Sequence, residues 1–292
     1  MMSEKKPIKA VQQFMLGTVM NKEAQAVETM HRMKAAGYEG IELCGFMIKP
    51  MSMAVKLLTK AAGMPVGNGG KLNWIKLVKE SGLKTVSVHE QLGYIENETS
   101  SAIEEAKSFD TDNIVVTAMY RFDYCDRENV KKLAERLNKA GQKLKDSNIK
   151  LLYHNHNCEF VPFRDGKYDD GRCAYELLMN NTDENLVSFE FDSYWASDAG
   201  VNALEIMTRL GQRLKLYHIT DRGCRQSGAA VTPILKMDCM ECGTGCMDLA
   251  ALINQAEKAD AEAVILESHR NWTEKSPVRS FEVSAEFLNK HI

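Results

Sequence analysis

The sequence predicts a (β/α)8 TIM barrel in which residues 1–292 form a single domain. Strand-like apolar segments alternate with helix-like segments along the whole chain, which is typical of a parallel sheet. The strand-like segments reach eight, a number that the runner-up fold, an open doubly wound sheet, rarely needs. With 292 residues, 44% of them hydrophobic, the chain is long enough to bury one large core.

The first half of the chain supplies four of the predicted strands, at residues 11–16, 40–44, 85–89 and 113–118. Helices are expected between and after them, at residues 22–36, 54–62, 72–81, 102–109 and 127–147. The last of these is the clearest, because its leucines and Val130 recur at helical spacing on one face. Asp126 precedes that helix as its expected N-cap.

The second half supplies the other four strands, which begin at residues 149, 187, 214 and 263. Helices are expected at residues 174–179, 203–210, 248–259 and 278–289, and a long loop at residues 222–246. The pair Asp165-Gly166 between apolar residues predicts a hairpin after the fifth strand. The pair Gly243-x-Gly245 predicts a tight turn before the helix at 248–259.

Side chains that bind metals occur where the last four strands end. The run from residue 149 to 159 contains His154, His156 and Glu159, and the next three strands end at Asp192, His218 and Glu267. Because the carboxyl ends of barrel strands meet on one face, these side chains are expected to converge. A bound divalent cation would explain the pattern.

Several motifs resemble those of the xylose isomerase-like TIM barrels, in the sugar phosphate isomerase/epimerase branch whose fifth strand ends His-Asn-His-x-x-Glu-Phe. The similar stretches are residues 154–160, 191–195, 217–221, 243–248 and 266–267. The resemblance extends from about Val11 onward. It implies a divalent ion, usually Mn²⁺, held by Glu159, Asp192, His218 and Glu267.

Two histidines leave open which residue after the fifth strand is the metal ligand. His154 and His156 lie nearer the strand than Glu159, so either could replace or supplement it. Strand geometry sends both to the same side, where a neutral imidazole would suit a proton shuttle or a donor to a sugar hydroxyl. His89, at the end of the third strand, has the same interpretation. The alternative for each is a packed core histidine.

The donor set also bears on the metal. Three carboxylates and one imidazole favour Mn²⁺, Mg²⁺ or Co²⁺ over a structural Zn²⁺, and Zn²⁺ stays as a further candidate. Cysteines 224, 239, 242 and 246 could form a zinc clip, but their spacing is irregular and free thiols are favoured.

Further residues are candidates for substrate binding. Trp195 follows the metal aspartate and could stack on a sugar ring, or simply pack in the core. Arg222, in the loop after the seventh strand, could clamp a phosphate or carboxylate, as could Arg225 and Arg270; the alternative is plain exposure. This chain has Thr220 where the similar branch usually has a lysine, which adds no support for a phosphorylated substrate.

We therefore expect a metal-dependent isomerase or epimerase of a sugar or keto sugar. The metal would stabilise an enediolate, and the resemblance implies that Glu159 and Glu267 exchange a proton from opposite faces of the sugar. His156, as the possible proton shuttle, is a third candidate catalytic residue. The alternative is a lyase, hydratase or C-glycoside deglycosidase subunit that acts on 3-keto-glycosides. Nothing in the residues separates these outcomes.

Other function classes are disfavoured. A net charge of −3, a pI near 6.2 and no basic cluster argue against an endonuclease or another nucleic-acid partner. Four filled ligand positions argue against a non-catalytic barrel. The sequence has no membrane-length apolar run and no signal-peptide core, and its eight cysteines suit a reducing compartment, so we expect a cytoplasmic protein. The resemblance also implies a homo-oligomer.

Overall fold

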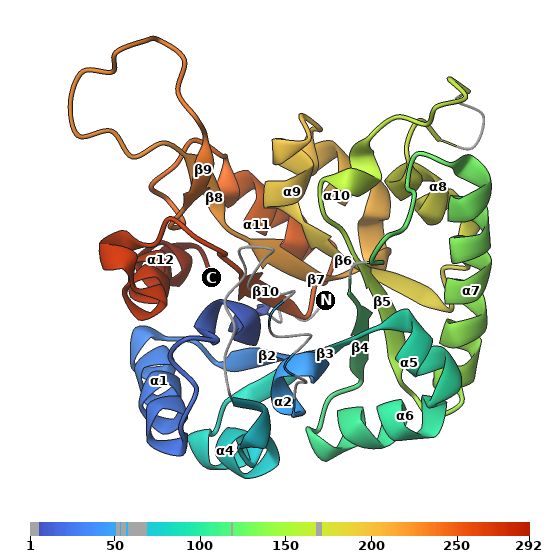
Figure 1. Cartoon of the computed structure of the whole chain (residues 1–292), viewed down its shortest axis with the longest axis horizontal. Coiled ribbons are helices and arrows are strands. Elements are labelled where there is room, and N and C mark those ends of the chain that lie inside the picture. The colour runs from blue at the N-terminus through green and yellow to red at the C-terminus, as the bar shows by residue number, and fades with distance from the viewer. Residues whose placement is uncertain (1–5, 51–52, 54–56, 58–68, 118, 168–170) are drawn as a thin grey trace.

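The described part of the chain closes into a barrel of parallel strands surrounded by helices (Figure 1). The structure is a computed structural model, and it describes residues 6–50, 53, 57, 69–117, 119–167 and 171–292. The strands follow one another around the barrel in the order β1-β10-β7-β6-β5-β4-β3-β2. The predicted (β/α)8 class is confirmed.

The barrel strands are short, and at its carboxyl end each strand leads into a helix or a loop. Their bounds are β1 Ile8–Gln12, β2 Gly40–Cys44, β3 Lys84–Glu90, β4 Asn113–Val116, β5 Lys150–His154, β6 Val187–Asp192, β7 Leu214–Ile219 and β10 Ala263–Leu266. Their interiors are almost wholly buried, as expected for strands covered on both faces.

The helices surround the barrel and cover its outer face (Figure 1). The larger ones are α1 Glu23–Ala36, α4 Trp74–Ser81, α6 Thr99–Ser108, α7 Arg127–Lys145, α8 Ala174–Asn181, α10 Ala203–Leu210, α11 Leu249–Lys258 and α12 Pro277–His291. Short helices follow three strands directly, α2 Gly45–Ile48, α5 Leu92–Asn97 and α9 Ser193–Asp198. No helix in the described ranges is both long and apolar enough to cross a membrane. The helix expected at 54–62 falls outside the described residues, apart from Leu57.

The first strand was placed too late in the chain by the sequence pattern. It runs from Ile8 to Gln12, and residues 13–16 form a 3-10 helix instead. The side chain of Gln12 explains the turn, because its Oε1 accepts a hydrogen bond from the Phe14 backbone N–H at 2.7 Å. Ile8 meanwhile pairs with Ala263 in β10.

The region expected to be a long loop contains a small antiparallel sheet. Strand β8, Asp221–Gly223, pairs with β9, Asp238–Met240, and the chain between them projects away from the barrel (Figure 1). Behind this sheet, Asp221 accepts hydrogen bonds from the backbone N–H groups of Gly243, Gly245 and Met247 at 2.9–3.1 Å. The backbone of the predicted turn at 243–245 is thus hydrogen-bonded to the Asp221 carboxylate.

The barrel interior is layered. Its floor is an apolar cluster of residues that lie mostly at the third position of their strands, made of Ala10, Val86, Val115, Leu152, Leu216, Ala263 and Ile265. Leu152 and Leu216 precede His154 and His218 by two positions, so the histidines point inward one layer higher. Above the floor the interior is ionisable, whereas barrels of this kind are usually filled with branched apolar side chains.

Helix α7 packs so closely on the chain before β6 that it needs a glycine. A Cβ added to Gly141 would lie 2.3 Å from the carbonyl oxygen of Leu186. We predict that Gly141→Ala lowers the free energy of unfolding by about 1–3 kcal/mol through overpacking. A Cβ on Gly93 in α5 would meet nothing within 4 Å.

Gly93→Ala is therefore the matched control, and it is expected to stabilise the protein by about 0.5–1 kcal/mol. Urea denaturation of both variants checks the pair. Equal shifts of the two midpoints would contradict the close approach of α7 to Leu186.

Candidate metal centre

Four buried side chains meet at the carboxyl ends of the barrel strands. His154 ends β5, Asp192 ends β6, His218 lies near the end of β7, and Glu267 directly follows β10. One ligand atom from each lies within 4.8 Å of the others. His218 Nδ1 is 3.0 Å from Glu267 Oε2 and 3.9 Å from Asp192 Oδ2. We call this group the metal centre.

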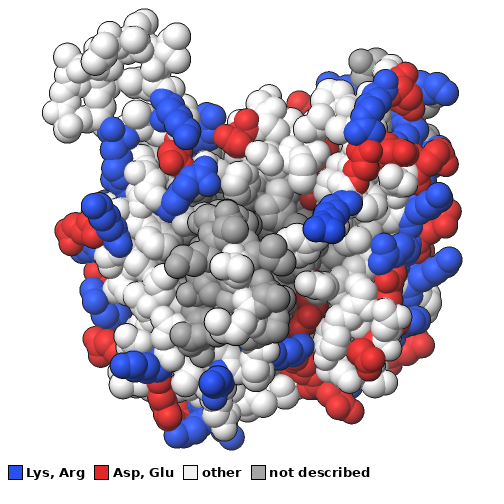
Figure 2. All heavy atoms as spheres, viewed as in Figure 1, with Lys and Arg blue, Asp and Glu red and all other residues white. Residues whose placement is uncertain are grey.

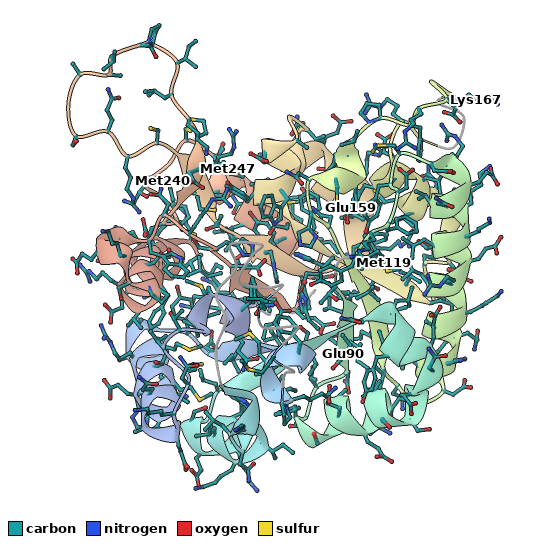
Figure 3. All side chains as sticks on the ribbon, viewed as in Figure 1. Glu90, Met119, Glu159, Lys167, Met240 and Met247 are labelled. Carbon is teal, nitrogen blue, oxygen red and sulfur yellow. The ribbon has the colours of Figure 1, made fainter. Side chains whose placement is uncertain are left out.

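The structure brings three of the four expected ligands together but not Glu159. Strand β5 stops at His154, and the chain then turns into a 3-10 helix at Cys158–Phe160. This turn directs Glu159, labelled in Figure 3, toward its own segment. Its carboxylate accepts hydrogen bonds from the Tyr153 hydroxyl at 2.9 Å and the His156 backbone N–H at 3.0 Å. His154, the replacement that the sequence left open, occupies the metal centre instead.

This donor set fits a divalent transition-metal ion. Two imidazoles and two carboxylates suit Mn²⁺, Co²⁺ or Zn²⁺. Burial raises the pKa of Asp192 to about 7, although His154 and His218 oppose this. Burial alone would also raise the pKa of Glu267, but His269 and His218 hold it below its usual range. Carboxylates buried this deeply are stabilised as anions by a neighbouring cation.

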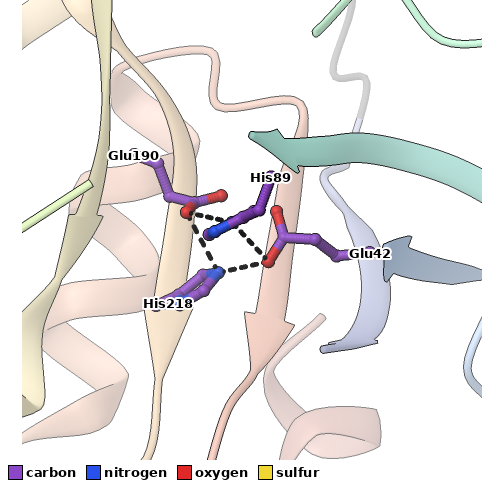
Figure 4. A group of neighbouring side chains, drawn as sticks. All are labelled: Glu42, His89, Glu190 and His218. Atoms are coloured by element: carbon purple, nitrogen blue, oxygen red, sulfur yellow. Dashed lines mark hydrogen bonds and ion pairs between the residues drawn. The ribbon is translucent and has the colours of Figure 1, made fainter. Parts of the chain in front are cut away.

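A second group lies on the other side of His218, deeper in the barrel. Glu42 from β2, His89 from β3 and Glu190 from β6 join His218 in what we call the inner ring (Figure 4). Carboxylates and imidazoles alternate around it, at N–O distances of 2.6, 3.2, 2.8 and 3.3 Å. Both carboxylates are fully buried. Neither was identified from the sequence.

His89 belongs to this ring through its Nε2, which lies between the carboxylates of Glu42 and Glu190. Because Nε2 faces these two carboxylates, its position does not support the substrate-binding role expected for His89. Burial would lower the pKa of His89, but Glu42 and Glu190 raise it to about 10. His89 is therefore a counter-charge for the two carboxylates at neutral pH.

Three aromatic side chains form a wall beside the metal centre. The Trp195 ring lies 5.9 Å from that of His156 and 5.6 Å from that of His269, centroid to centroid. His156 Nδ1, Trp195 Nε1 and His269 Nε2 are buried, and none has a hydrogen-bond partner among the described residues. Buried polar atoms without a partner are uncommon, and a polar ligand is one explanation for them. We call these three residues the aromatic wall.

The wall includes two residues that the sequence singled out and one that it did not. His156 and Trp195 were candidates, whereas His269 was missed, although it lies only two residues beyond Glu267. His269 Nε2 is 3.7 Å from Glu267 Oε2. Burial and the nearby His154 lower the pKa of His156 to about 3, so this imidazole is neutral.

The candidate arginines of the later loops are paired with carboxylates. Arg222 Nε lies 3.4 Å from Asp198 Oδ1, and Arg270 Nε lies 2.7 Å from Asp238 Oδ1. Arg225 pairs with the buried Glu241. Figure 2 shows acidic and basic side chains interspersed around the rim of the molecule in this view. The arginines thus have structural partners of their own.

The cysteines near β9 do not take part in either ionisable group. Cys239 and Cys242 are buried, and the Cys246 thiol donates to the Arg222 carbonyl oxygen at 2.9 Å. The two candidate metal-binding groups found among the described residues contain histidine and carboxylates alone. Thr220, which takes the place of the lysine, is also buried, with its hydroxyl 3.4 Å from the Met240 carbonyl oxygen.

The sequence is similar to curated inosose dehydratases. It is 30% identical to the one from Clostridium beijerinckii over 142 residues, which are 49% of this chain and 40% of that protein. It is 36% identical to the one from Clostridium perfringens over 96 residues, which are 33% of this chain and 30% of that protein. The chain thus matches less than half the length of these relatives.

Solved structures and a family model cover far more of the chain. A sugar phosphate isomerase/epimerase from Parabacteroides distasonis superposes with a TM-score of 0.72 at 20% identity, over 99% of this chain and 95% of that one. An L-ribulose 3-epimerase superposes with a TM-score of 0.64 at 12% identity, over 98% and 94%. At such identities these two likenesses concern the fold. The sequence model of the xylose isomerase-like TIM barrels matches residues 30–291, and the chain belongs to that family.

Proposed function

We propose that the protein is a metal-dependent lyase that acts on a cyclic keto polyol. Its first step would remove a proton from the carbon beside the carbonyl group, and its second would expel the oxygen substituent on the next carbon. The observation that carries the proposal is the position of one candidate base, Glu267, which belongs to the metal centre and lies 3.7 Å from His269 of the aromatic wall.

The metal centre, His154, Asp192, His218 and Glu267, would hold the cation. When bound, a divalent cation supplies Lewis-acid stabilisation of negative charge on the carbonyl oxygen. The donor set supports Mn²⁺, Co²⁺ or Zn²⁺ for this role, with Mn²⁺ first because the family resemblance implies it. Mg²⁺ is less suited to two imidazoles.

Glu267 would act as the base. His269 and His218 hold the pKa of this carboxyl below its usual range, so it is ionised at neutral pH and can accept a proton. The wall residues His156, Trp195 and His269 would donate hydrogen bonds to the hydroxyl groups of the substrate. The departing oxygen would take the proton that Glu267 removed, with His156 as a hydrogen-bond donor to that oxygen, while the electron pair of the broken C–H bond forms the new double bond.

Elimination is favoured over proton exchange between two carboxylates. The exchange expected from the sequence used Glu159 as the second carboxylate, and Glu159 hydrogen-bonds within its own segment instead. The curated relatives are named as dehydratases of an inosose, and dehydration of a keto polyol is an elimination of this type. The 3-keto-glycosides offer the same arrangement of carbonyl, acidic carbon and leaving group.

The second candidate is the isomerase or epimerase. One feature favours it: the imidazoles of His156 and His269 both lie near Trp195, at 5.9 Å and 5.6 Å between ring centroids. If His156 and His269 contact opposite faces of a substrate, one could return the proton that Glu267 removes. The outcome would then be an inverted carbon and no lost group.

Proton exchange in deuterium oxide tests both candidates. The Mn²⁺-loaded protein would be incubated with an inosose, a 3-keto-glucoside and a free ketose, and the products followed by NMR and ultraviolet absorbance. We expect an unsaturated ketone from the first or second compound. Deuterium incorporation with an epimer and no unsaturated product would establish the second candidate. Metal-loaded protein that exchanges no proton in any compound would overturn both.

A further inference from the structure

We infer that Glu42 and Glu190 are positioning residues that fix the ring nitrogens which His218 and His154 turn toward the metal centre. The inference rests on the proposed function, since it concerns the cation that the metal centre would hold. It goes beyond that function by assigning a task to the inner ring. In the described interactions, Glu42 and Glu190 contact neither Asp192 nor Glu267 of the metal centre.

His218 shows the arrangement most directly, because its two nitrogens face different groups. Nδ1 lies 3.0 Å from Glu267 Oε2 in the metal centre, and Nε2 makes a 2.6 Å hydrogen bond with Glu42 Oε2 in the inner ring (Figure 4). A neutral imidazole carries one N–H and one lone pair. Both nitrogens face carboxylates, which can only accept, so a cation at Nδ1 would take the place of the proton on that nitrogen. The other proton would stay on Nε2, where Glu42 holds it.

Glu190 extends the same control to the second imidazole of the metal centre. Its Oε2 lies 3.1 Å from His154 Nδ1 and 3.3 Å from His218 Nε2. His154 Nδ1 and Glu190 Oε2 are close enough for an ion pair but do not form a hydrogen bond. The negative charge of the carboxylate would therefore favour the proton on Nδ1 and the lone pair on Nε2. Glu190 is therefore within reach of both imidazoles, and for His218 it lies at the nitrogen that faces away from Glu267.

The remaining contacts hold the carboxylates themselves in place. Ser87 donates a hydrogen bond to Glu42 Oε1, which leaves Oε2 for His218. His89 Nε2 lies 3.2 Å from Glu42 and 2.8 Å from Glu190, so one imidazole joins the two carboxylates. Each of these residues belongs to β2, β3 or β6. Strand-borne groups position a site more rigidly than loop residues do.

The burial of these carboxylates needs a reason of this kind. Glu42 and Glu190 are 0% exposed, and a buried carboxylate is costly even when it is paired. Apolar side chains at the same positions would hold the barrel together at lower cost. Carboxylates that accept from metal-binding imidazoles orient the ring and raise its basicity, which apolar residues cannot do.

A second cation inside the ring is the competing explanation. It would have to displace the proton shared by His218 Nε2 and Glu42 Oε2, whose separation of 2.6 Å is a hydrogen-bond distance. It would also use His218 as a ligand through both nitrogens, which requires a deprotonated ring. The hydrogen bond between His218 and Glu42 needs neither condition.

Metal titration of Glu42→Gln and Glu190→Gln tests the inference. Isothermal titration with Mn²⁺ is expected to give an unchanged stoichiometry and an affinity about 10–100-fold weaker than wild type. The visible absorption bands of the Co²⁺-loaded variants should shift, because the imidazole donors change in orientation and basicity. A structural defect alone would not change the Co²⁺ spectrum of the folded fraction.

Glu176→Gln is the matched control. Glu176 is also a buried carboxylate, but it lies on α8 and pairs with Arg172 and Arg209, at 2.9 and 3.0 Å. The Glu176→Gln variant should bind Mn²⁺ and Co²⁺ as the wild-type protein does. A double-mutant cycle of Glu42→Gln with His218→Asn completes the design, since a residue that acts through His218 has no further effect once His218 is replaced.

Three results would overturn the inference, and they are distinguishable. Wild-type affinity and spectra in both glutamine variants would show that the ring has no part in metal binding. A wild-type stoichiometry of two, reduced to one in the variants, would place a cation inside the ring. A wild-type protein that binds neither Mn²⁺ nor Co²⁺ would remove the proposed function and this inference together.

Discussion

Replacing His154 by alanine is expected to abolish stoichiometric binding of Mn²⁺, whereas Glu159→Gln is expected to preserve it. His154 belongs to the buried group whose ligand atoms lie within 4.8 Å of one another, and Glu159 does not. Since the loss of an outer partner already costs about 10–100-fold in metal affinity, the loss of a direct ligand should cost more. Elemental mass spectrometry and isothermal titration of the purified variants measure the effect.

Asp192→Ala serves as the positive control in that comparison, because both the sequence and the geometry assign it to the metal centre. The opposite pattern, with metal lost in Glu159→Gln and kept in His154→Ala, would mean that Glu159 leaves its hydrogen bonds to Tyr153 and His156 when a cation binds. The ligand set originally implied by the family resemblance would then stand.

The second large effect is expected at Glu267. We predict that Glu267→Gln lowers the rate of proton exchange between substrate and deuterium oxide by about 10²–10⁴-fold, the usual contribution of a general base. The amide is nearly the same size as the carboxylate but cannot accept the proton. Because Glu267 also belongs to the metal centre, the rate must be measured at saturating Mn²⁺ with the bound metal quantified.

Trp195→Phe separates this effect from a loss of substrate binding. The substitution removes the unpartnered Nε1 donor and keeps an aromatic ring beside His156 and His269. It should raise KM and leave the exchange rate at saturating substrate close to wild type. If metal-loaded Glu267→Gln exchanged protons at the wild-type rate, the base would have to be sought in the aromatic wall.

Most of the fold could be predicted from sequence because a parallel barrel leaves a strong periodic signal. Each strand of the second half begins where expected, within one residue. The first strand was misplaced because its side chains alternate less clearly, and its end depends on a hydrogen bond from the Gln12 side chain. The β8–β9 pairing joins segments separated by a long excursion of the chain, which local patterns do not report.

The metal centre could be predicted only in part, and the reason is geometric. Asp192, His218 and Glu267 lie at or next to the ends of their strands, so strand position alone brought them together. Glu159 lies five residues beyond the end of β5, where a 3-10 turn decides its direction. Strand alternation pointed to His154, and that local signal describes the geometry better than the motif did.

The inner ring escaped prediction because its carboxylates lie within strands and not at their ends. Glu42 is the one charged residue of β2, and Glu190 stands between two phenylalanines in β6. A lone acid in an apolar strand signals either an error in the strand assignment or a buried partner. The partners here come from β3, β5 and β7, far away in the sequence.

The layering of the barrel interior bears on how such proteins diverge. The apolar floor, which includes Leu152 and Leu216, joins strands around the barrel without using the groups above it. Substitutions among the upper groups can therefore alter reactivity while the floor keeps the fold, since activity depends on the site and not on the architecture. A barrel built in this way offers natural selection a durable scaffold on which new reactions can arise from old ones.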